Sequence, residues 1–494
     1  MKQYLRFAIL FVAVGLMACN PDVEEPETSG GSTETEPITI ETDTVWNHEV
    51  TIVYSGSSAT VTTNTDSVTY SVSGGDVTIT STAKNVSYSA SGSGSGSLKI
   101  YSDYRYKLTL NSLTLTSSGK PVINNQGKKS LFLNLSGTSV LSDASGYATE
   151  SNSEDQKGAI FSEGQLIILG DGKLTVAGKN KHAVASDDFI LMQSGTVVVT
   201  SAPTDGFHSN DAFQMDGGSL TITSTDEGIA VDEGTVLING GAITITTSGT
   251  TAKGIKSEGN LSITGGTVVV HATHGSGDSG SEGIESKASI TISGGDIFVE
   301  SYDDGINAAN GDITISGGYV YSHATNNDGI DANGDFTVKG GVIVAIGASG
   351  AERALDALEQ KTLTIQGGVL FTIGGLESGA VLTQACYYSN SWSANTWYSM
   401  TIGNDVYAFK TPSSGGSTLV VSGSSEPTVK SGVTVSDGTS ILNGNGYLNA
   451  TVTGGSSVGV EAYSAGQGQG GGPGGQGGGP GGQGGGPGGG GGWH

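Results

Sequence analysis

The hydrophobic residues of this chain recur at a fixed distance from pairs of glycines. Two places after each Gly-Gly pair between residues 217 and 368 stands an aliphatic residue. This column consists of Leu220, Ile243, Val268, Ile297, Val320, Ile343 and Leu370. Successive residues of a strand face opposite sides of a sheet, so the column predicts the inward face of a short strand that repeats along the chain.

A second marker gives the length of the repeat. A glycine, or alanine at the last position, stands directly before a hydrophobic residue once in every repeat. These small residues occupy positions 206, 228, 254, 283, 305, 329 and 354, with intervals of 22, 26, 29, 22, 24 and 25 residues. We call each such pair a step, and each turn of the chain a rung. Short strands and glycines at this period predict an all-β solenoid, a right-handed parallel β-helix.

The repeat also divides the chain into domains. We expect the β-helix over residues 38–375, with irregular N-terminal cap rungs first and regular rungs from about 158 to 375. Residues 351–360 are the nearest approach to a helical pattern. Residues 376–462 break the pattern and are expected to form a C-terminal β-rich cap. The Gly/Gln/Pro-rich residues 463–494 predict a flexible tail.

The N-terminus has the pattern of an exported lipoprotein. Residues 1–18 combine a basic end with a short apolar run, which is typical of a signal peptide. Leu16 to Cys19 resembles a bacterial lipobox, and the acidic residues 19–37 predict a disordered tether. We therefore expect an outer-membrane lipoprotein, anchored through a lipid on Cys19 and exposed at the cell surface. An ordinary cleaved signal is the alternative.

Composition narrows the range of partners. The chain of 494 residues carries a net charge of −26, contains 83 glycines, and has only 14% charged residues. Such an acidic surface repels nucleic acid and favours divalent cations. Cys386 is the only cysteine besides Cys19, so no intramolecular disulfide is expected in the mature chain. The sequence leaves the oligomeric state open.

Two polar columns flank the steps. The first column holds the residue before each step glycine, and the second holds the residue two places after it. Equivalent residues of adjacent rungs lie about 4.8 Å apart, so stacked carboxylates repel unless a cation binds them. The predicted calcium ligands are Glu282, Glu285, Asp303, Asp304, Asn307, Asp328, Asp331 and Asp356. A second, weaker site comprises Asp205, Asp226, Glu227 and Asp232. A solvated acidic corner without an ion is the alternative.

Basic residues in the same columns allow two interpretations. Lys253 and Lys256 can act as a base beside calcium, removing a proton next to a uronate carboxylate. The simpler interpretation is that they pair with Glu227, Glu282 or Glu285. The histidines His182, His208, His271, His274 and His323 follow the rungs without a compact zinc pattern, and are expected to be ordinary surface residues.

Aromatic residues gather on the outside of one predicted sheet. Phe298, Tyr319, Tyr321 and Phe371 flank the inward column. Such a stripe can stack against the faces of sugar rings. Residues 376–462 or a second copy of the chain can equally cover it.

Several segments resemble a known family. These are residues 131–143, residues 158–166, and the Asp-Gly-Ile-Asp/Asn-Ala rungs at 304–308 and 328–332. They are similar to secreted bacterial β-helix proteins that bind calcium and plant-wall polysaccharides such as cellulose and pectin. That family resembles the family-nine pectate lyases in fold. The resemblance covers roughly residues 100–375 and implies carbohydrate binding.

The sequence departs from the family pattern at three rungs. Ala183 replaces a step glycine, Lys253 replaces a column acid, and the last step reads Arg353-Ala354-Leu355. We expect a surface-anchored, calcium-dependent protein that binds a polysaccharide without cleaving it. A calcium-dependent uronate lyase is the first alternative, and a structural or adhesive surface protein is the second.

Overall fold

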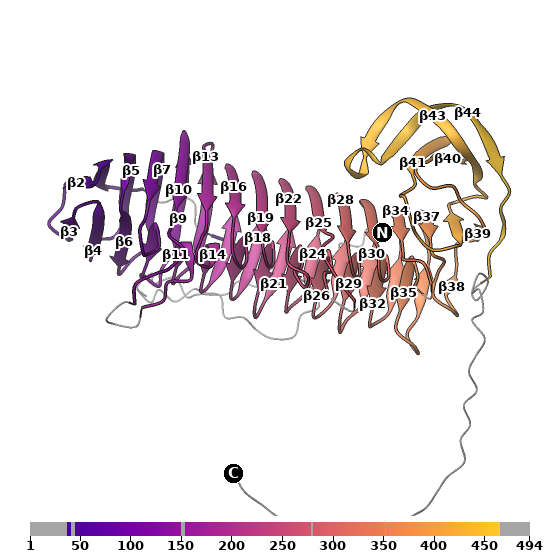
Figure 1. Ribbon diagram of the computed structural model, residues 1–494, viewed down its shortest axis with the longest axis horizontal. Coiled ribbons are helices and arrows are strands. Elements are labelled where there is room, and N and C mark those ends of the chain that lie inside the picture. The colour runs from indigo at the N-terminus through magenta and orange to yellow at the C-terminus, as the bar shows by residue number, and fades with distance from the viewer. Residues whose placement is uncertain (1–36, 41–44, 150–153, 278–279, 351, 465–494) are drawn as a thin grey trace, which may run out of the picture. The chain divides into compact units, whose positions relative to one another are not determined.

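The computed structural model describes residues 37–40, 45–149, 154–277, 280–350 and 352–464. The expectations for the signal peptide, Cys19, nearly all of the tether and nearly all of the tail fall outside these residues. The described chain forms an all-β parallel solenoid followed by a small closed barrel (Figure 1). Within these ranges, no helix has the length and hydropathy needed to cross a membrane.

Each regular rung contributes one strand to each of three faces. The first face is a sheet of 13 strands. Its strands are β3 (Val68–Ser73), β4 (Asp76–Ser81), β6 (Ser97–Ser102), β8 (Ile123–Asn125), β11 (Gly158–Ser162), β14 (His182–Ser186), β17 (Phe207–Ser209), β20 (Ile229–Val231), β23 (Ile255–Ser257), β26 (Ile284–Ser286), β29 (Ile306–Ala308), β32 (Ile330–Ala332) and β35 (Leu355–Ala357).

The second face follows the first after a short corner. It contains β9 (Leu131–Ser136), β12 (Leu166–Gly170), β15 (Phe189–Met192), β18 (Ala212–Met215), β21 (Thr235–Ile238), β24 (Leu261–Ile263), β27 (Ile290–Ile292), β30 (Ile313–Ile315), β33 (Phe336–Val338), β36 (Leu363–Ile365) and β38 (Val381–Leu382). All pairings between neighbours on this face are parallel.

The third face carries the longer strands. They are β1 (His48–Gly56), β5 (Val86–Ser95), β7 (Tyr106–Thr116), β10 (Thr138–Ser142), β13 (Lys173–Ala177), β16 (Thr196–Ser201), β19 (Ser219–Ser224), β22 (Ala242–Thr247), β25 (Thr267–Ala272), β28 (Asp296–Ser301), β31 (Tyr319–Ala324), β34 (Val342–Ile346) and β37 (Val369–Ile373). The long β7 pairs with both β9 and β10, and so joins the second and third faces.

The solenoid core confirms the register read from the glycine pairs. Leu220 pairs with Ile243, and each later member of the predicted column pairs with the next. All seven side chains are buried. The second glycine of each pair adopts a left-handed backbone, for example φ +81° at Gly318, where a Cβ atom would lie 2.7 Å from the carbonyl oxygen of Gly294. Glycine is therefore required at this corner.

The two ends of the solenoid are irregular, as the sequence predicted. At the start, β1 pairs antiparallel with β2 (Ser58–Thr63), and β3 pairs antiparallel with β4. The helix considered for residues 351–360 was wrong, because Leu355–Ala357 is strand β35 and pairs with β32.

The C-terminal region is β-rich and closes the last rungs. The strand β42 (Leu419–Ser422) pairs antiparallel with β37 and with β39 (Cys386–Ser389), and β39 also pairs with β45 (Glu461–Ala462). Between them lies a closed barrel of β40 (Trp397–Ile402), β41 (Asp405–Lys410), β43 (Thr428–Ile441) and β44 (Gly446–Val458), with the 3-10 turn η1 (Leu442–Gly444).

The barrel covers part of the third face. Phe298, Tyr321 and Phe371 lie in one buried cluster with side chains of the barrel, and Phe371 contacts the rings of Tyr398 and Phe409. Burial leaves these three aromatic side chains inaccessible to a sugar. The interpretation in which residues 376–462 fold back over the stripe describes them correctly, and the sugar-stacking role predicted for them is withdrawn.

Candidate metal and carbohydrate sites

The first column is a continuous stack along the first face. The N–H of each step glycine donates to the carbonyl oxygen of the first-column residue on the next rung: Gly283 to Asp304 at 3.0 Å, and Gly305 to Asp328 at 3.1 Å. The step glycine is required here because a Cβ atom at Gly283 would lie 2.6 Å from the carbonyl oxygen of Gly305. Glu282, Asp304 and Asp328 therefore share one edge of the solenoid.

The second column stacks in the same way within the strands of the first face. Glu285 pairs with Asn307, Asn307 with Asp331, and Asp331 with Asp356. The structure thus brings most of the residues proposed as calcium ligands into two adjacent in-register columns.

Two oxygens of the second column lack partners. Glu285 is only 2% exposed and Asn307 only 8%. Neither Glu285 Oε2 nor Asn307 Oδ1 has a hydrogen-bond partner within the described chain, although Lys287 contacts the other Glu285 oxygen. A buried acceptor without a partner costs about 1–3 kcal/mol. These neighbouring oxygens are suited to a hard cation, since calcium takes carboxylate and amide oxygens.

The raised pKa values of the column carboxylates also favour a bound cation. Burial, together with Asp331, Asp328 and Asp303, raises the pKa of Asp304 to about 9. Burial raises the pKa of Asp328 to about 7 and that of Asp331 to about 6. Burial also raises the pKa of Asp303. In the absence of a cation, ionised carboxylates are therefore unfavourable along this edge.

The carboxylates are not equally close. One ligand atom from each of Asp328, Asp331 and Asp356 lies within 4.8 Å of the others. Burial and the neighbouring Glu377 raise the pKa of Asp356 to about 9. Among the described residues, Glu282, Glu285, Asp303 and Asp304 belong to no such group of three. The three predicted calcium ligands that lie closest together therefore come from the last two rungs of the set.

The weaker predicted site is only partly assembled. Ligand atoms of Asp205, Asp226 and Glu227 lie within 4.8 Å of one another. Burial, Asp205 and Asp226 raise the pKa of Glu227 to about 8. Asp232 does not join this group, and instead its Oδ2 atom lies 3.5 Å from Nε2 of His208.

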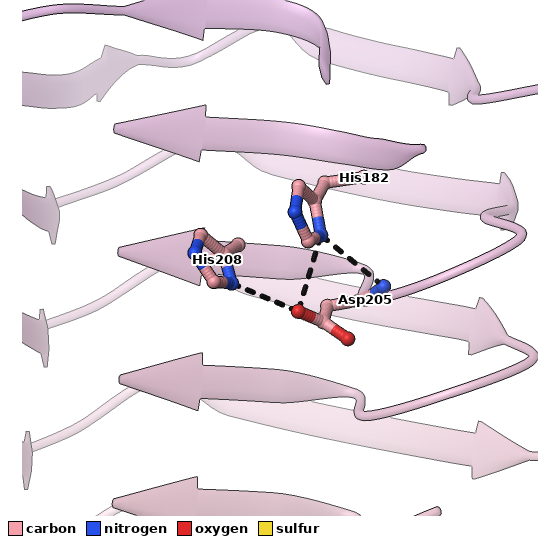
Figure 2. Close-up of side chains that lie close together, drawn as sticks. All are labelled: His182, Asp205 and His208. Atoms are coloured by element: carbon pink, nitrogen blue, oxygen red, sulfur yellow. Dashed lines mark hydrogen bonds and ion pairs between the residues drawn. The ribbon is translucent and has the colours of Figure 1, made fainter. Parts of the chain in front are cut away.

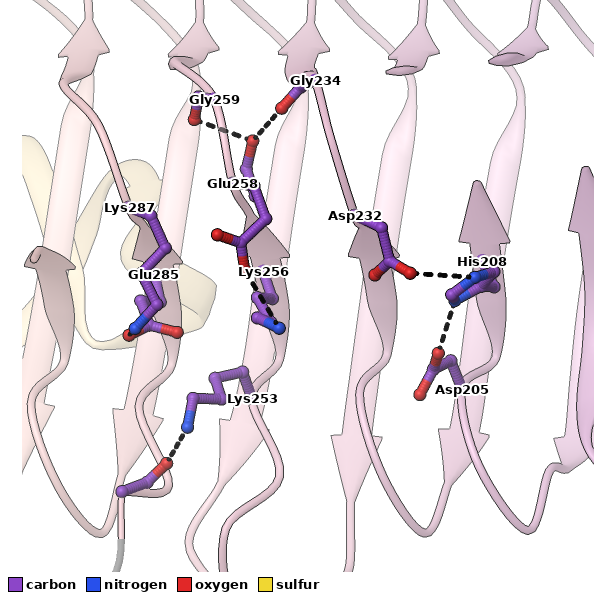
Figure 3. A network of polar contacts seen from close by, with 12 residues as sticks. Asp205, His208, Asp232, Gly234, Lys253, Lys256, Glu258, Gly259, Glu285 and Lys287 are labelled. Atoms are coloured by element: carbon purple, nitrogen blue, oxygen red, sulfur yellow. Dashed lines mark hydrogen bonds and ion pairs between the residues drawn. The ribbon is translucent and has the colours of Figure 1, made fainter. Parts of the chain in front are cut away.

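Each of the two column lysines lies close to a carboxylate, and Figure 3 shows the contact of Lys256 with Glu258. Lys253 Nζ lies 3.0 Å from Glu282 Oε2, which confirms one of the predicted pairings, and it donates to the carbonyl oxygen of Gly280 at 2.6 Å. Lys256 Nζ lies 3.3 Å from Glu258, a residue that the sequence interpretation did not consider. Partial burial lowers the pKa of Lys256, but the contact with Glu258 and the other neighbouring carboxylates outweigh it and raise the pKa overall, so Lys256 is not arranged as a ready base.

Two histidines expected to be ordinary surface residues form a compact cluster with Asp205 (Figure 2). A signal for this cluster was present in the sequence. The N–H of Ala183 donates to the carbonyl oxygen of Asp205, so Ala183 holds a step position and His182 belongs to the first column. His208 belongs to the second column, one rung later. The predicted columns began at Asp205, one rung after His182, although Ala183 was already identified as replacing a step glycine.

Tyr319 of the predicted aromatic stripe borders a cavity. The cavity has a volume of about 640 Å³. Tyr319 comes from the start of β31 and Tyr407 from β41 of the barrel. The lining residues are Gly266, Gly295, Asp296, Gly317, Gly318, Tyr319, Gly341, Val342, Val369 and Tyr407.

The walls of this cavity combine aromatic, apolar and acidic groups. The stacked corner glycines carry no side chains, so the floor is main chain. Asp296 Oδ1 accepts the N–H of Leu442 at 2.8 Å, and burial raises the pKa of Asp296. Sequence reasoning missed Tyr407 because it lies nearly 90 residues from Tyr319 in a region without the repeat.

Comparison with protein-family models identifies the family of this chain. The family model of carbohydrate-binding domain-containing proteins matches residues 73–327, more than half of the chain. The chain belongs to this family. The matched part includes the columns as far as Asp304 and Asn307, but ends before Asp328.

One solved structure shows similarity to the chain. It is described as the polysaccharide lyase-like protein from C. thermocellum, as a gadolinium derivative. The two chains share 22% sequence identity with a TM-score of 0.39, and the match covers 51% of this chain and 95% of the other. No curated protein matches the chain.

Proposed function

We propose that the protein binds a polysaccharide in the cavity between Tyr319 and Tyr407, holds calcium along its acidic columns, and does not cleave the bound chain. Membership of the carbohydrate-binding family supports the first part. The observation that carries it is a cavity lined by two tyrosines from different parts of the fold, together with the corner glycines. As the sequence predicts, we further propose that a lipid on Cys19 anchors the protein at the cell surface.

The cavity has chemistry suited to a sugar. Aromatic side chains provide flat apolar faces on which the C–H face of a sugar ring can stack. A floor without side chains lets a ring approach the main chain closely. The Asp296 carboxyl can accept a hydrogen bond from a sugar hydroxyl, which adds orientation to stacking.

The proposed calcium has a structural role. The oxygens that fit it belong to the first face and the corner before it, whereas Tyr319 begins a strand of the third face. Calcium bound by the columns would neutralise stacked carboxylates and stabilise the rungs. Residues that would hold it are Glu285, Asp304, Asn307, Asp328, Asp331 and Asp356, with Glu282 and Asp303 beside them.

The proposal is tested by measuring oligosaccharide affinity for Tyr319→Ala and Tyr407→Ala, with calcium present. We expect each variant to bind about tenfold more weakly, since one aromatic contact contributes about 1.5 kcal/mol. Tyr70→Ala, an exposed tyrosine on β3, is the control and should bind as the original chain. Unchanged affinity in both cavity variants would exclude this site.

The same samples test the absence of cleavage. Incubation with polygalacturonate and calcium should produce no absorbance from unsaturated uronate products. Product that forms with the original chain and is lost with Lys256→Ala would instead establish a lyase.

A further inference from the structure

Two imidazoles converge on one carboxylate at the edge of the first face (Figure 2). His182 begins β14, His208 lies in β17, and Asp205 precedes β17. One ligand atom from each of the three lies within 4.8 Å of the others. The rings stack with centroids 4.1 Å apart and an angle of 16° between their planes.

The contacts involve the same atom type on both rings. His182 Nδ1 lies 3.1 Å from Asp205 Oδ2, and His208 Nδ1 lies 2.9 Å from the same oxygen. The Asp205 side chain is 8% exposed, and those of His182 and His208 are 13% and 12% exposed. The cluster is therefore well enclosed but open to an ion from solvent.

Both nitrogens of His208 face carboxylates. Nε2 lies 3.5 Å from Asp232 Oδ2 and Nδ1 lies 2.9 Å from Asp205 Oδ2, so a neutral ring can donate to only one of the two (Figure 3). Nδ1 of His182 also contacts Oγ1 of Thr204 at 2.9 Å and accepts the N–H of Asp205 at 3.4 Å, and a metal would replace these two contacts. In the tautomer that carries the proton on Nε2 of both rings, two nitrogen lone pairs point toward one carboxylate oxygen, an arrangement that a cation relieves.

We propose that His182, Asp205 and His208 form a binding site for a divalent transition metal of the zinc class. Nδ1 of each histidine and Oδ2 of Asp205 supply the ligands, and Asp232 orients His208 from behind. Asp205 Oδ2 lies 3.1 Å and 2.9 Å from the two Nδ1 atoms, close to the separation of neighbouring ligands bonded to zinc at about 2.0–2.2 Å. Imidazole nitrogens favour such metals over calcium.

This assignment separates Asp205 from the weaker calcium set. Calcium prefers a site made only of oxygen ligands, whereas this site has two nitrogen ligands from adjacent rungs. Binding requires the near-parallel rings to tilt toward each other, a side-chain rotation that leaves the strands in place. The competing state is a pair of histidines whose Nδ1–H groups donate to Asp205, which needs no metal.

The experiment is zinc titration of the full chain by calorimetry at pH 7.5, after chelator treatment and with excess calcium present. Calcium occupies the acidic columns, so the titration reports on nitrogen-containing sites. We expect one zinc per chain, about 100-fold weaker binding in His182→Gln and in His208→Gln, and about tenfold weaker binding in Asp232→Asn.

The control is His271→Gln, because His271 contacts Glu300 on the third face, away from this cluster. It should bind zinc as the original chain does. Cobalt substitution provides a second readout, since its visible spectrum reports nitrogen and oxygen ligation. No zinc uptake, or uptake that survives both histidine substitutions in variants that melt cooperatively, would overturn the proposal in favour of the hydrogen-bonded pair.

Discussion

The N–H of Asp328 donates a 2.9 Å hydrogen bond to Oδ1 of Asp304, the residue in the same column one rung earlier. The N–H of Arg353 contacts Oδ1 of Asp328 in the same way. Another corner uses the same arrangement, where Asp312 Oδ1 accepts the N–H of Asp335 at 2.8 Å. One oxygen of Asp304 and one oxygen of Asp328 thus tie neighbouring rungs together, which leaves the second oxygen of each for a cation.

Because Asp304 accepts a hydrogen bond from the next rung and is also a proposed calcium ligand, two substitutions at this position should have different effects. Asp304→Asn keeps an acceptor for the Asp328 N–H but removes the charge, so we expect stability without metal to be equal to or above that of the original chain. Asp304→Ala leaves the N–H unpartnered and should lower the free energy of unfolding by about 1–3 kcal/mol. Both should reduce the calcium-induced rise in melting temperature, as measured by calorimetry.

Asp312→Asn is the matched control, because it keeps the same kind of rung-to-rung hydrogen bond outside the two columns. Its response to calcium should be that of the original chain. A full calcium response in Asp304→Asn would contradict ligation by this carboxylate.

The raised pKa values predict how stability depends on pH. An aspartate has a pKa of 3.8 when unfolded, whereas folding raises the pKa of Asp304 to about 9 and that of Asp328 to about 7. Between these values the folded state binds more protons than the unfolded state, so stability falls as pH rises. Without metal, the free energy of unfolding should therefore decrease from about pH 5 to pH 9.

Calcium should flatten this profile, because it stabilises the ionised carboxylates. Urea unfolding across that pH range, in chelator and in calcium, measures both curves. Asp304→Asn should have a shallower slope in chelator. A metal-free profile that is flat or rises with pH would show that the column carboxylates ionise freely in the folded state.

The sequence predicts the solenoid well because short-range sequence patterns are enough to define each rung. A left-handed glycine at each corner and an aliphatic residue two places later define the strand, its direction and its inward face. The same spacing gave the two columns, as the hydrogen bond from Gly283 to Asp304 confirms. These features depend only on neighbouring rungs.

Features that depend on distant segments could not be predicted in this way. Phe298 and Tyr321 lie outside the inward column, so their burial depends on a barrel that forms more than 70 residues later. Tyr407 lies in that barrel and has no periodic marker. His182 was missed for a different reason, since the predicted columns began at Asp205, one rung beyond it.

Docking of the barrel predicts a coupling between stability and carbohydrate binding. Phe371 is buried against Tyr398 and Phe409, so Phe371→Ala should cost about 3–5 kcal/mol and loosen the barrel that carries Tyr407. Sugar affinity should fall with it. Phe336→Ala, a buried phenylalanine inside the solenoid, is the control and should lower stability while sparing affinity. Calorimetry and oligosaccharide binding separate the two effects, and equal affinity in both variants would argue against a barrel contribution.

Lys253 replaces an acid in the first column, and its ion pair with Glu282 offers the last prediction. Both side chains are largely buried, at 16% and 10% exposed. Lys253→Met leaves the Glu282 charge uncompensated and should lower metal-free stability by about 3 kcal/mol. The column then gains negative charge, so calcium should bind more tightly and restore more of the lost stability than in the original chain.

The control is Lys256→Met. Its partner Glu258 is more exposed, so the loss of this ion pair should cost less than about 1 kcal/mol. Urea unfolding with and without calcium measures these differences, and an equal calcium increment in Lys253→Met and the original chain would place Glu282 outside the reach of the ion.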